Sequence, residues 1–329
     1  MATKKAASTK KATVKKPAAA KTTVRTLSAE TSSAKVAKPA PKAIARPVVE
    51  PVVRDRRSSL PTNIINVILA ELVGTFILTL AAILPFSAGL SGANGVLSAI
   101  GVGATVAVLV MVVGAVSGAH LNPAVTFALW TMRRLRAILV PFYWGSQFLG
   151  AMLAVIVVNW VSNSSLSLSF GHLWNFNWAI FAIELIGTAV FLFGLTAAIT
   201  RRELSVGTRA VTIGASLALG VIVSSTLLNS AITDATLSYQ KAAEATQSSS
   251  TSSSSPTIPY AIHIRGATLN PAVALASTEK SDNELMSSSS TTKDSANSRF
   301  TLEVVLGTLI GAALGGNLYL LVAGRNRND

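Results

Sequence analysis

A chain of 329 residues in which 50% are hydrophobic and only 13% are charged is too apolar for an ordinary water-soluble protein, and its mean hydropathy of +0.52 indicates membrane spans. The formal net charge of +14 is gathered in residues 1–57, which hold more than half of the 28 Lys and Arg residues but only three of the 14 acidic residues. The absence of cysteine excludes disulfide bonds and thiolate metal sites.

Residues 1–57 are predicted to form a disordered basic cytoplasmic tail. Lys, Ala, Thr, Pro and Ser dominate the segment, and it contains no aromatic residue, so it cannot bury a core. Lys-rich tails can neutralise nucleic-acid phosphates. Because no aromatic residue is available for base stacking, attraction to anionic lipid head groups is the favoured interpretation.

Six apolar segments long enough to cross a bilayer as helices follow the tail. They lie at about residues 63–85, 94–116, 136–160, 177–199, 207–229 and 300–323. Two shorter apolar segments, 121–130 and 269–276, cannot cross, and they fit half-helices that enter the bilayer and turn back.

The placement of arginine predicts that both termini are cytoplasmic. With an even number of spans, the tail and three arginine groups fall on one side, which the positive-inside rule assigns to the cytoplasm. The groups are Arg133, Arg134 and Arg136, then Arg201, Arg202 and Arg209, and finally Arg325 and Arg327. On the other side, residues 232–258 and 277–298 are Ser/Thr-rich and are predicted to be disordered outer loops, with a glycosylated stalk as the alternative.

Two sequence motifs each occur twice. Glu71-Leu-Val-Gly-Thr-Phe in the first span recurs as Glu184-Leu-Ile-Gly-Thr-Ala in the fourth, and Gly118-Ala-His-Leu-Asn-Pro-Ala-Val recurs from Gly266 as Gly-Ala-Thr-Leu-Asn-Pro-Ala-Val. Each half holds three spans, an odd number, so the second copy enters the membrane from the opposite face. The predicted repeats cover about residues 63–165 and 177–323.

Each repeat contains one Asn-Pro-Ala sequence that is suited to begin a helix. Asn is a good N-cap, and Pro fits the first helical position, where its missing N–H is not needed. A single copy is usually only a cap, whereas two copies with the same neighbours at equivalent places of an inverted repeat predict paired half-helices. The two copies are Asn122-Pro123-Ala124 and Asn270-Pro271-Ala272.

With these motifs the chain resembles the aquaporin, or major intrinsic protein, family over about residues 63–323, apart from the two Ser-rich inserts. The segment from Ser117 to Thr126 is similar to the first family signature over its whole length. The resemblance implies that residues 58–329 form an all-α membrane domain, an inverted 3+3 repeat of six transmembrane helices with two re-entrant half-helices. It also implies a homotetramer with one pore per subunit.

The implied function is a passive channel for water that excludes ions and protons, with glycerol, urea and ammonia as further candidate solutes. Two positive half-helix ends at the bilayer centre repel cations, and the side chains of Asn122 and Asn270 donate hydrogen bonds to passing water. The resemblance gives Glu71 and Glu184 the role of holding the loops. It assigns pore-lining carbonyl groups to Gly118, Ala119, His120, Leu121, Gly266, Ala267, Thr268 and Leu269.

The predicted selectivity filter departs from the family pattern. Strict water channels usually have Arg directly after the second Asn-Pro-Ala, where this chain has Val273. The other filter positions, placed by spacing, are Val102, Val221 and Ala267, so an uncharged, apolar and wider constriction is expected. Alternatively, Arg265 could swing toward the mouth and restore a positive charge, although a solvated loop position is favoured.

No nucleophile triad, phosphate loop, metal-ligand spacing or cofactor motif is found, so an enzyme is not expected. His120 is interpreted as a loop-orienting residue, and His172 and His263 as outer-loop residues without an identified partner. Two other functions stay open, a secondary transporter and a membrane anchor that presents the basic tail. The basic tail and the outer loops near 86–93 and 161–176, which carry no Lys or Arg, suggest a bacterial inner membrane.

Overall fold

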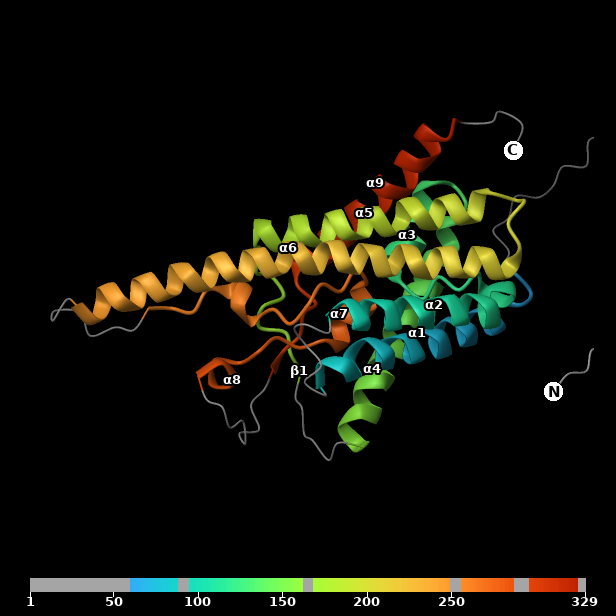
Figure 1. The fold of residues 1–329 in the computed structure, drawn as a ribbon. Coiled ribbons are helices and arrows are strands. Elements are labelled where there is room, and N and C mark those ends of the chain that lie inside the picture. Colours follow the sequence, from blue (N-terminus) through green and yellow to red (C-terminus); the bar gives the residue numbers. More distant parts are fainter. Residues whose placement is uncertain (1–59, 88–94, 162–167, 249–255, 287–295, 325–329) are drawn as a thin grey trace, which may run out of the picture. The chain divides into compact units, whose positions relative to one another are not determined.

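Six long helices form a bundle in the described part of the chain (Figure 1). The computed structural model describes residues 60–87, 95–161, 168–248, 256–286 and 296–324, so the predicted tail, residues 1–57, lies outside the described residues. Each long helix is apolar enough to cross a membrane. They are α1 (Ile64–Ser87), α2 (Gly95–Ser117), α4 (Val140–Val161), α5 (Trp178–Thr200), α6 (Val206–Ser248) and α9 (Leu302–Val322).

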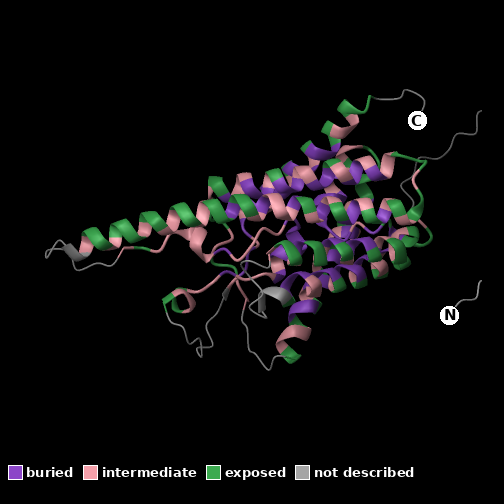
Figure 2. Cartoon of the chain, viewed as in Figure 1, coloured by how far each residue is buried: buried purple, intermediate pink, exposed green. Residues whose placement is uncertain are grey.

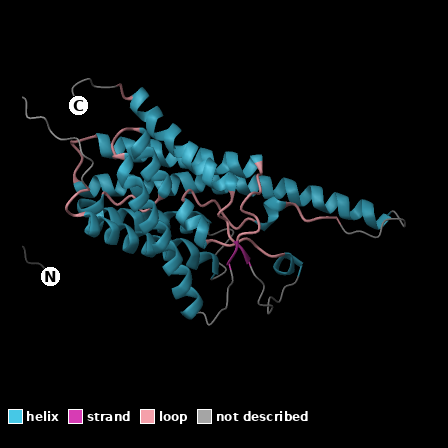
Figure 3. Ribbon diagram, turned by 180° about the vertical axis from the view of Figure 1, so that it is seen from behind, coloured by secondary structure: helices cyan, strands magenta, loops and turns pink. Residues whose placement is uncertain are grey.

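Short elements connect these helices. The two half-helices are α3 (Pro123–Thr131) and α7 (Pro271–Ala276), which confirms the predicted short helices. The 3-10 turn η1 (Ala137–Leu139) precedes α4. The opposite end of the bundle, called here the loop end, carries η2 (Tyr260–His263), α8 (Asp282–Met286) and two short parallel strands, β1 (Leu168–Ser169) and β2 (Ala296–Asn297), with Leu168 opposite Ala296 (Figure 3).

The burial pattern is that of a protein whose solvent is lipid. Large apolar side chains such as Leu97, Trp160 and Leu321 are exposed, whereas Thr75, Thr188 and other polar residues are buried. Figure 2 shows exposed positions along the outer faces of the helices and buried positions where the helices meet. Because lipid tails are as apolar as leucine, helices associate in a bilayer through close packing and internal hydrogen bonds. The six predicted spans are thereby confirmed as the walls of one bundle.

Two glycines bring equivalent helix pairs into close contact. A Cβ atom at Gly150 of α4 would overlap the carbonyl oxygen of Leu72 in α1. In the second repeat, a Cβ atom at Gly311 of α9 would overlap the carbonyl oxygen of Leu185 in α5. Leu72 and Leu185 follow the repeated glutamates directly, so the same packing occurs once in each half of the chain, as the inverted repeat predicts.

The predicted outer loop at residues 232–258 is wrong for residues 232–248, which continue α6 as far as Ser248. The segment contains neither Gly nor Pro and is rich in Ala, so nothing in it ends a helix. Its hydroxyl groups bond one turn back, as in Thr233 Oγ1 to Asn229 O at 2.8 Å. These bonds give the hydroxyl groups partners within the helix itself; residues 249–255 lie outside the described residues.

The disorder predicted for the second loop, residues 277–298, is also wrong where the structure describes it. Thr278 forms an antiparallel bridge with Ser298, and Glu279 is only 3% exposed. Glu279 accepts hydrogen bonds from partners far along the chain, which hold the segment against the bundle. Residues 287–295 lie outside the described residues.

Candidate functional site

The two half-helices begin face to face. Asn122 caps α3 and Asn270 caps α7, each from an extended backbone with Pro at the first helical position. Nδ2 of Asn122 donates to the carbonyl oxygen of Leu269 at 2.9 Å, and Nδ2 of Asn270 donates to that of Leu121 at 3.0 Å. The first bond joins residues 147 positions apart in the chain and the second joins residues 149 positions apart. Together they hold the two Asn-Pro-Ala sequences next to each other.

The orientation of both asparagine amides is fixed by these contacts. Oδ1 of Asn122 accepts from the backbone N–H of Ala124 at 2.8 Å, and Oδ1 of Asn270 accepts from that of Ala272 at 3.0 Å. The oxygen of each amide therefore faces its own helix, and the NH2 group faces the opposite loop. An amide NH2 has two donors, so each asparagine keeps one N–H beyond the bond to the opposing carbonyl.

The first loop has a strained backbone that Glu71 stabilises. Ala119 and Leu121 have φ values of 50° and 54°, in the left-handed region that non-glycine residues rarely occupy. Glu71 is fully buried in α1. Its carboxylate accepts from Ser117 Oγ at 2.6 Å, His120 N at 2.9 Å, Leu121 N at 2.7 Å and Gln147 Nε2 at 2.8 Å.

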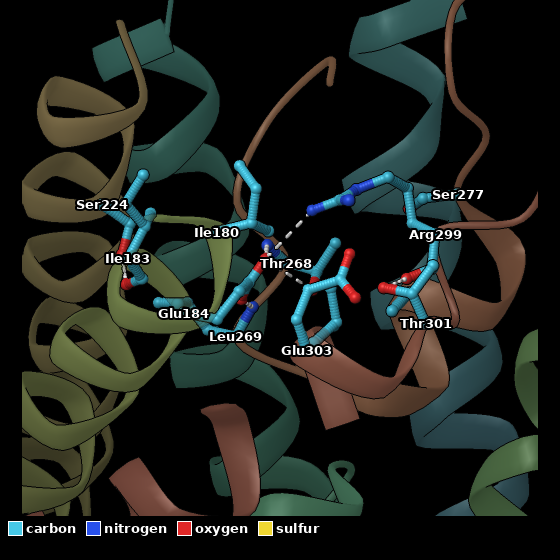
Figure 4. Close-up of polar contacts among 12 residues, drawn as sticks. Ile180, Ile183, Glu184, Ser224, Thr268, Leu269, Ser277, Arg299, Thr301 and Glu303 are labelled. Atoms are coloured by element: carbon cyan, nitrogen blue, oxygen red, sulfur yellow. Dashed lines mark hydrogen bonds and ion pairs between the residues drawn. The ribbon is translucent and has the colours of Figure 1, made fainter. Parts of the chain in front are cut away.

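Glu184 of α5 holds the second loop in a comparable way (Figure 4). Its Oε1 accepts from the backbone N–H of Thr268 at 3.0 Å, and its Oε2 from that of Leu269 at 2.9 Å. The residue that sequence reasoning missed is Arg299, whose Nη2 lies 3.5 Å from Glu184 Oε1 and whose side chain is 2% exposed. A signal was present, because an arginine adjoining a span at the loop end runs against the charge rule.

A cavity lies beside the two asparagines and offers about 40 Å³ to the centres of water molecules. Since one water needs roughly 10–15 Å³ of such space, the cavity has room for a short file of waters. Asn122, Asn270, His120 and Thr268 form its polar side. Among the described residues that line it, none is Asp, Glu, Lys or Arg, so the lining carries no formal charge with histidine neutral.

The predicted filter residues are only partly brought together. Val102, Val221 and Val273 all line this cavity, with other apolar residues of α1, α2, α5 and α6. Ala267 is not among the lining residues and packs against buried hydrophobic side chains. Arg265 forms an ion pair with Glu284 and does not line the cavity, so it does not supply the missing positive charge.

The three histidines all have partners. His120 stacks on Tyr143 with ring centroids 4.2 Å apart, and its Nδ1 lies 3.1 Å from Thr126 Oγ1. The structure supplies the partners that the sequence did not identify for the two outer-loop histidines. His172 Nδ1 lies 2.8 Å from Glu279 Oε2, and His263 Nδ1 lies 2.9 Å from the carbonyl oxygen of Lys280.

The comparisons with known proteins agree with this geometry. The Major intrinsic protein family pattern matches residues 59–238. Aquaporin NIP2-1 of Zea mays is 34% identical over 165 residues, which cover 49% of this chain and 53% of the plant protein. Aquaporin Z of Photorhabdus laumondii is 32% identical over 184 residues, which cover 50% of this chain and 79% of the bacterial protein.

Other matches are shorter or more distant. Aquaporin NIP2-1 of Oryza sativa is 39% identical over 103 residues, 30% of this chain and 34% of the rice protein. The chain thus spans about half or less of the length of the plant relatives it matches. The aquaglyceroporin structure from Plasmodium falciparum aligns at 18% identity with a TM-score of 0.47, over 80% of this chain and 96% of that one. Because the family pattern covers more than half of its residues, this chain belongs to the major intrinsic protein family.

Proposed function

We propose that this protein is a passive channel for water and small neutral solutes that excludes ions and protons. The observation that carries the proposal is the pair of reciprocal hydrogen bonds between Asn122 and Leu269 and between Asn270 and Leu121. They place two amide donors side by side in an uncharged cavity within a bundle of membrane spans. The relatives whose names describe them as aquaporins support the same function.

The fixed amides give the channel a mechanism for passing water but not protons. The remaining N–H of Asn122 and of Asn270 can each donate to the oxygen of a passing water. A water that accepts from both points its own hydrogens outward, so it cannot relay a proton from one neighbour to the next. The positive end of α3, whose N-cap is Asn122, adds an electrostatic barrier to cations.

The lining supports a solute range wider than water alone. At the position that follows the second Asn-Pro-Ala, the cavity has the methyl groups of Val273, with Val102 and Val221 nearby in the lining. A valine neither offers a hydrogen bond nor holds a charge, so the discrimination that an arginine would impose is absent there. We include glycerol, urea and ammonia among the proposed solutes for this reason.

The cellular setting follows from charge placement and family membership. We propose that the bundle end with Arg133, Arg134 and Arg201 faces the cytoplasm with both termini, and that the loop end faces outward. The basic tail, residues 1–57, is proposed to touch anionic lipid. A bacterial inner membrane and a homotetramer are proposed from the sequence and the family resemblance.

Stopped-flow light scattering on proteoliposomes tests the function, with water and glycerol gradients run side by side. Faster shrinkage than in empty liposomes under both gradients supports the proposal, and no difference from empty liposomes contradicts it. Saturable, ion-coupled uptake would favour a secondary transporter. Deleting residues 1–57 should leave a channel permeable, whereas a membrane anchor for the tail would lose its binding partner.

A further inference from the structure

The two re-entrant loops need the same support but receive it from different donors. Glu71 and Glu184 occupy equivalent places, since each is followed by the leucine against which Gly150 or Gly311 packs. Glu71 accepts hydrogen bonds from its own loop and from the side-chain amide of Gln147 in α4. Aligning α4 and α9 on Gly150 and Gly311 identifies the residue of α9 that would be placed to donate a hydrogen bond to Glu184 as Gln147 does to Glu71.

That residue is Thr308, which lies three positions before Gly311, as Gln147 lies three positions before Gly150. Thr308 does not reach Glu184. Its Oγ1 donates to carbonyl oxygens of its own helix, to Val304 at 2.8 Å and to Val305 at 3.1 Å. The second repeat therefore lacks the amide donor of the first.

Arg299 takes the vacant place. It precedes α9, and its Nη2 lies 3.5 Å from Glu184 Oε1 (Figure 4). The backbone N–H of Arg299 donates to the carbonyl oxygen of Ser277 at 2.9 Å, and its Nη1 donates to Tyr260 Oη at 3.4 Å. Ser277, which follows α7 in the chain, thus holds the Arg299 backbone, and Tyr260, which precedes α7, holds the guanidinium.

The charges around Arg299 make its role electrostatic as well as structural. Glu184, Glu279 and Glu303 are each at most 3% exposed, and Tyr260 Oη contacts the last two at 2.6 and 3.2 Å. A buried carboxylate without a partner is costly, and its negative charge attracts nearby cations by Coulomb's law. Glu184 directly contacts Thr268, a residue of the cavity lining, so its charge lies immediately behind the pore wall.

We propose that Arg299 is the positioning residue of the second loop. It neutralises Glu184 from behind the pore wall, aims the Thr268 and Leu269 backbone, and keeps cations out of a lining that has no charge of its own. The positive charge at this end of the pore thus acts through Glu184 and not from the position of Val273. This inference rests on the proposed channel function.

The test compares Arg299→Met with the double variant Arg299→Met/Glu184→Gln in proteoliposomes, measuring both water permeability and efflux of trapped potassium. The single variant is expected to lose about ten-fold in water permeability and to leak potassium, because it leaves Glu184 uncompensated. The double variant is expected to recover cation exclusion. Arg265→Ala is the matched control, since it removes a loop-end arginine whose partner is Glu284, and it should behave as wild type.

A single variant that matches wild type in both measurements would overturn the proposal, and so would a double variant that leaks as much as the single one. If Arg299→Met folds but is too unstable to reconstitute, the melting temperature in detergent decides. The double variant should regain most of a loss of about 10 °C, and no recovery would refute the coupling. The melting measurement needs no conduction, so it still tests Arg299 if the wild-type protein proves impermeable. An impermeable wild-type protein would contradict the channel function itself.

Discussion

The first and second re-entrant loops have nearly the same sequence, yet their surroundings differ in chemistry. The first is held by neutral donors within the membrane spans, where Glu71 accepts from Ser117, Gln147 and its own loop backbone. The second is held by an ionic network that reaches from Glu184 through Arg299 to the loop end. Equivalent loops of an inverted repeat can thus be held by residues of the membrane spans in one half and by residues of the outer segments in the other.

The largest expected effect on stability comes from removing the Glu71 carboxylate, which accepts all the hydrogen bonds of the first network. In Glu71→Leu, four buried donors lose their acceptor, at about 1–3 kcal/mol each before any relaxation. That loss is comparable with the whole stability of a typical domain, so we expect no folded protein. Fluorescence-detected size-exclusion chromatography should show an aggregate, while the exposed control Glu203→Ala should elute normally.

The next effect concerns the contact that both loops share. Asn270→Asp keeps the capping oxygen but removes the Nδ2 donor to Leu121 and adds a negative charge beside the cavity. We expect a loss of about ten-fold in water permeability together with a potassium leak, because the electrostatic barrier is weakened.

The control for this variant is Asn317→Asp, which removes a similar amide donor, to Thr131, at an exposed site. Stopped-flow scattering and potassium efflux measure both. Unchanged permeability and no leak in Asn270→Asp would show that the reciprocal bonds do not form the barrier.

A smaller effect is expected from removing the side-chain amide of Gln147, the donor that has no counterpart in the second repeat. Gln147→Leu removes hydrogen bonds to Glu71 Oε2 and to Thr126 Oγ1. It should cost about 2–3 kcal/mol and lower the melting temperature by about 5–10 °C. In contrast, Thr308→Val loses only bonds to its own helix and should melt close to wild type; equal losses would contradict the assigned difference between the repeats.

The sequence allowed much of the site to be predicted because its signals are local. Asn122, Asn270, Glu71 and Glu184 belong to short motifs that repeat, and a repeat in register marks them without any structure. Arg299 gave only the weaker signal of an arginine at the loop end, because it forms no motif and its partner Glu184 is remote in the chain. The same limit applies to residues 232–248, where Ser/Thr composition suggested a loop although no residue there breaks a helix.

The smallest effect tests how far the ionic network reaches into the loop end. Tyr260→Phe removes the hydroxyl that donates to Glu279 at 2.6 Å and accepts from Arg299. We expect a loss of about 1–2 kcal/mol in stability and a drop of a few degrees in melting temperature. Water permeability should change little, since Arg299 keeps its contact with Glu184.

The pH dependence of this loss tests whether the Tyr260 hydroxyl stays protonated across the working range. Burial raises the pKa of Tyr260 above its ordinary value of 10.0, with the nearby Glu279 acting in the same direction. A raised folded-state pKa means that the contribution is fully present below the unfolded pKa and is lost only as the pH rises through the folded one. The difference in melting temperature between wild type and Tyr260→Phe should therefore stay constant from about pH 6 to pH 9. A difference that vanishes within that range would mean that the Tyr260 hydroxyl is not the protonated donor that links Glu279 to Arg299.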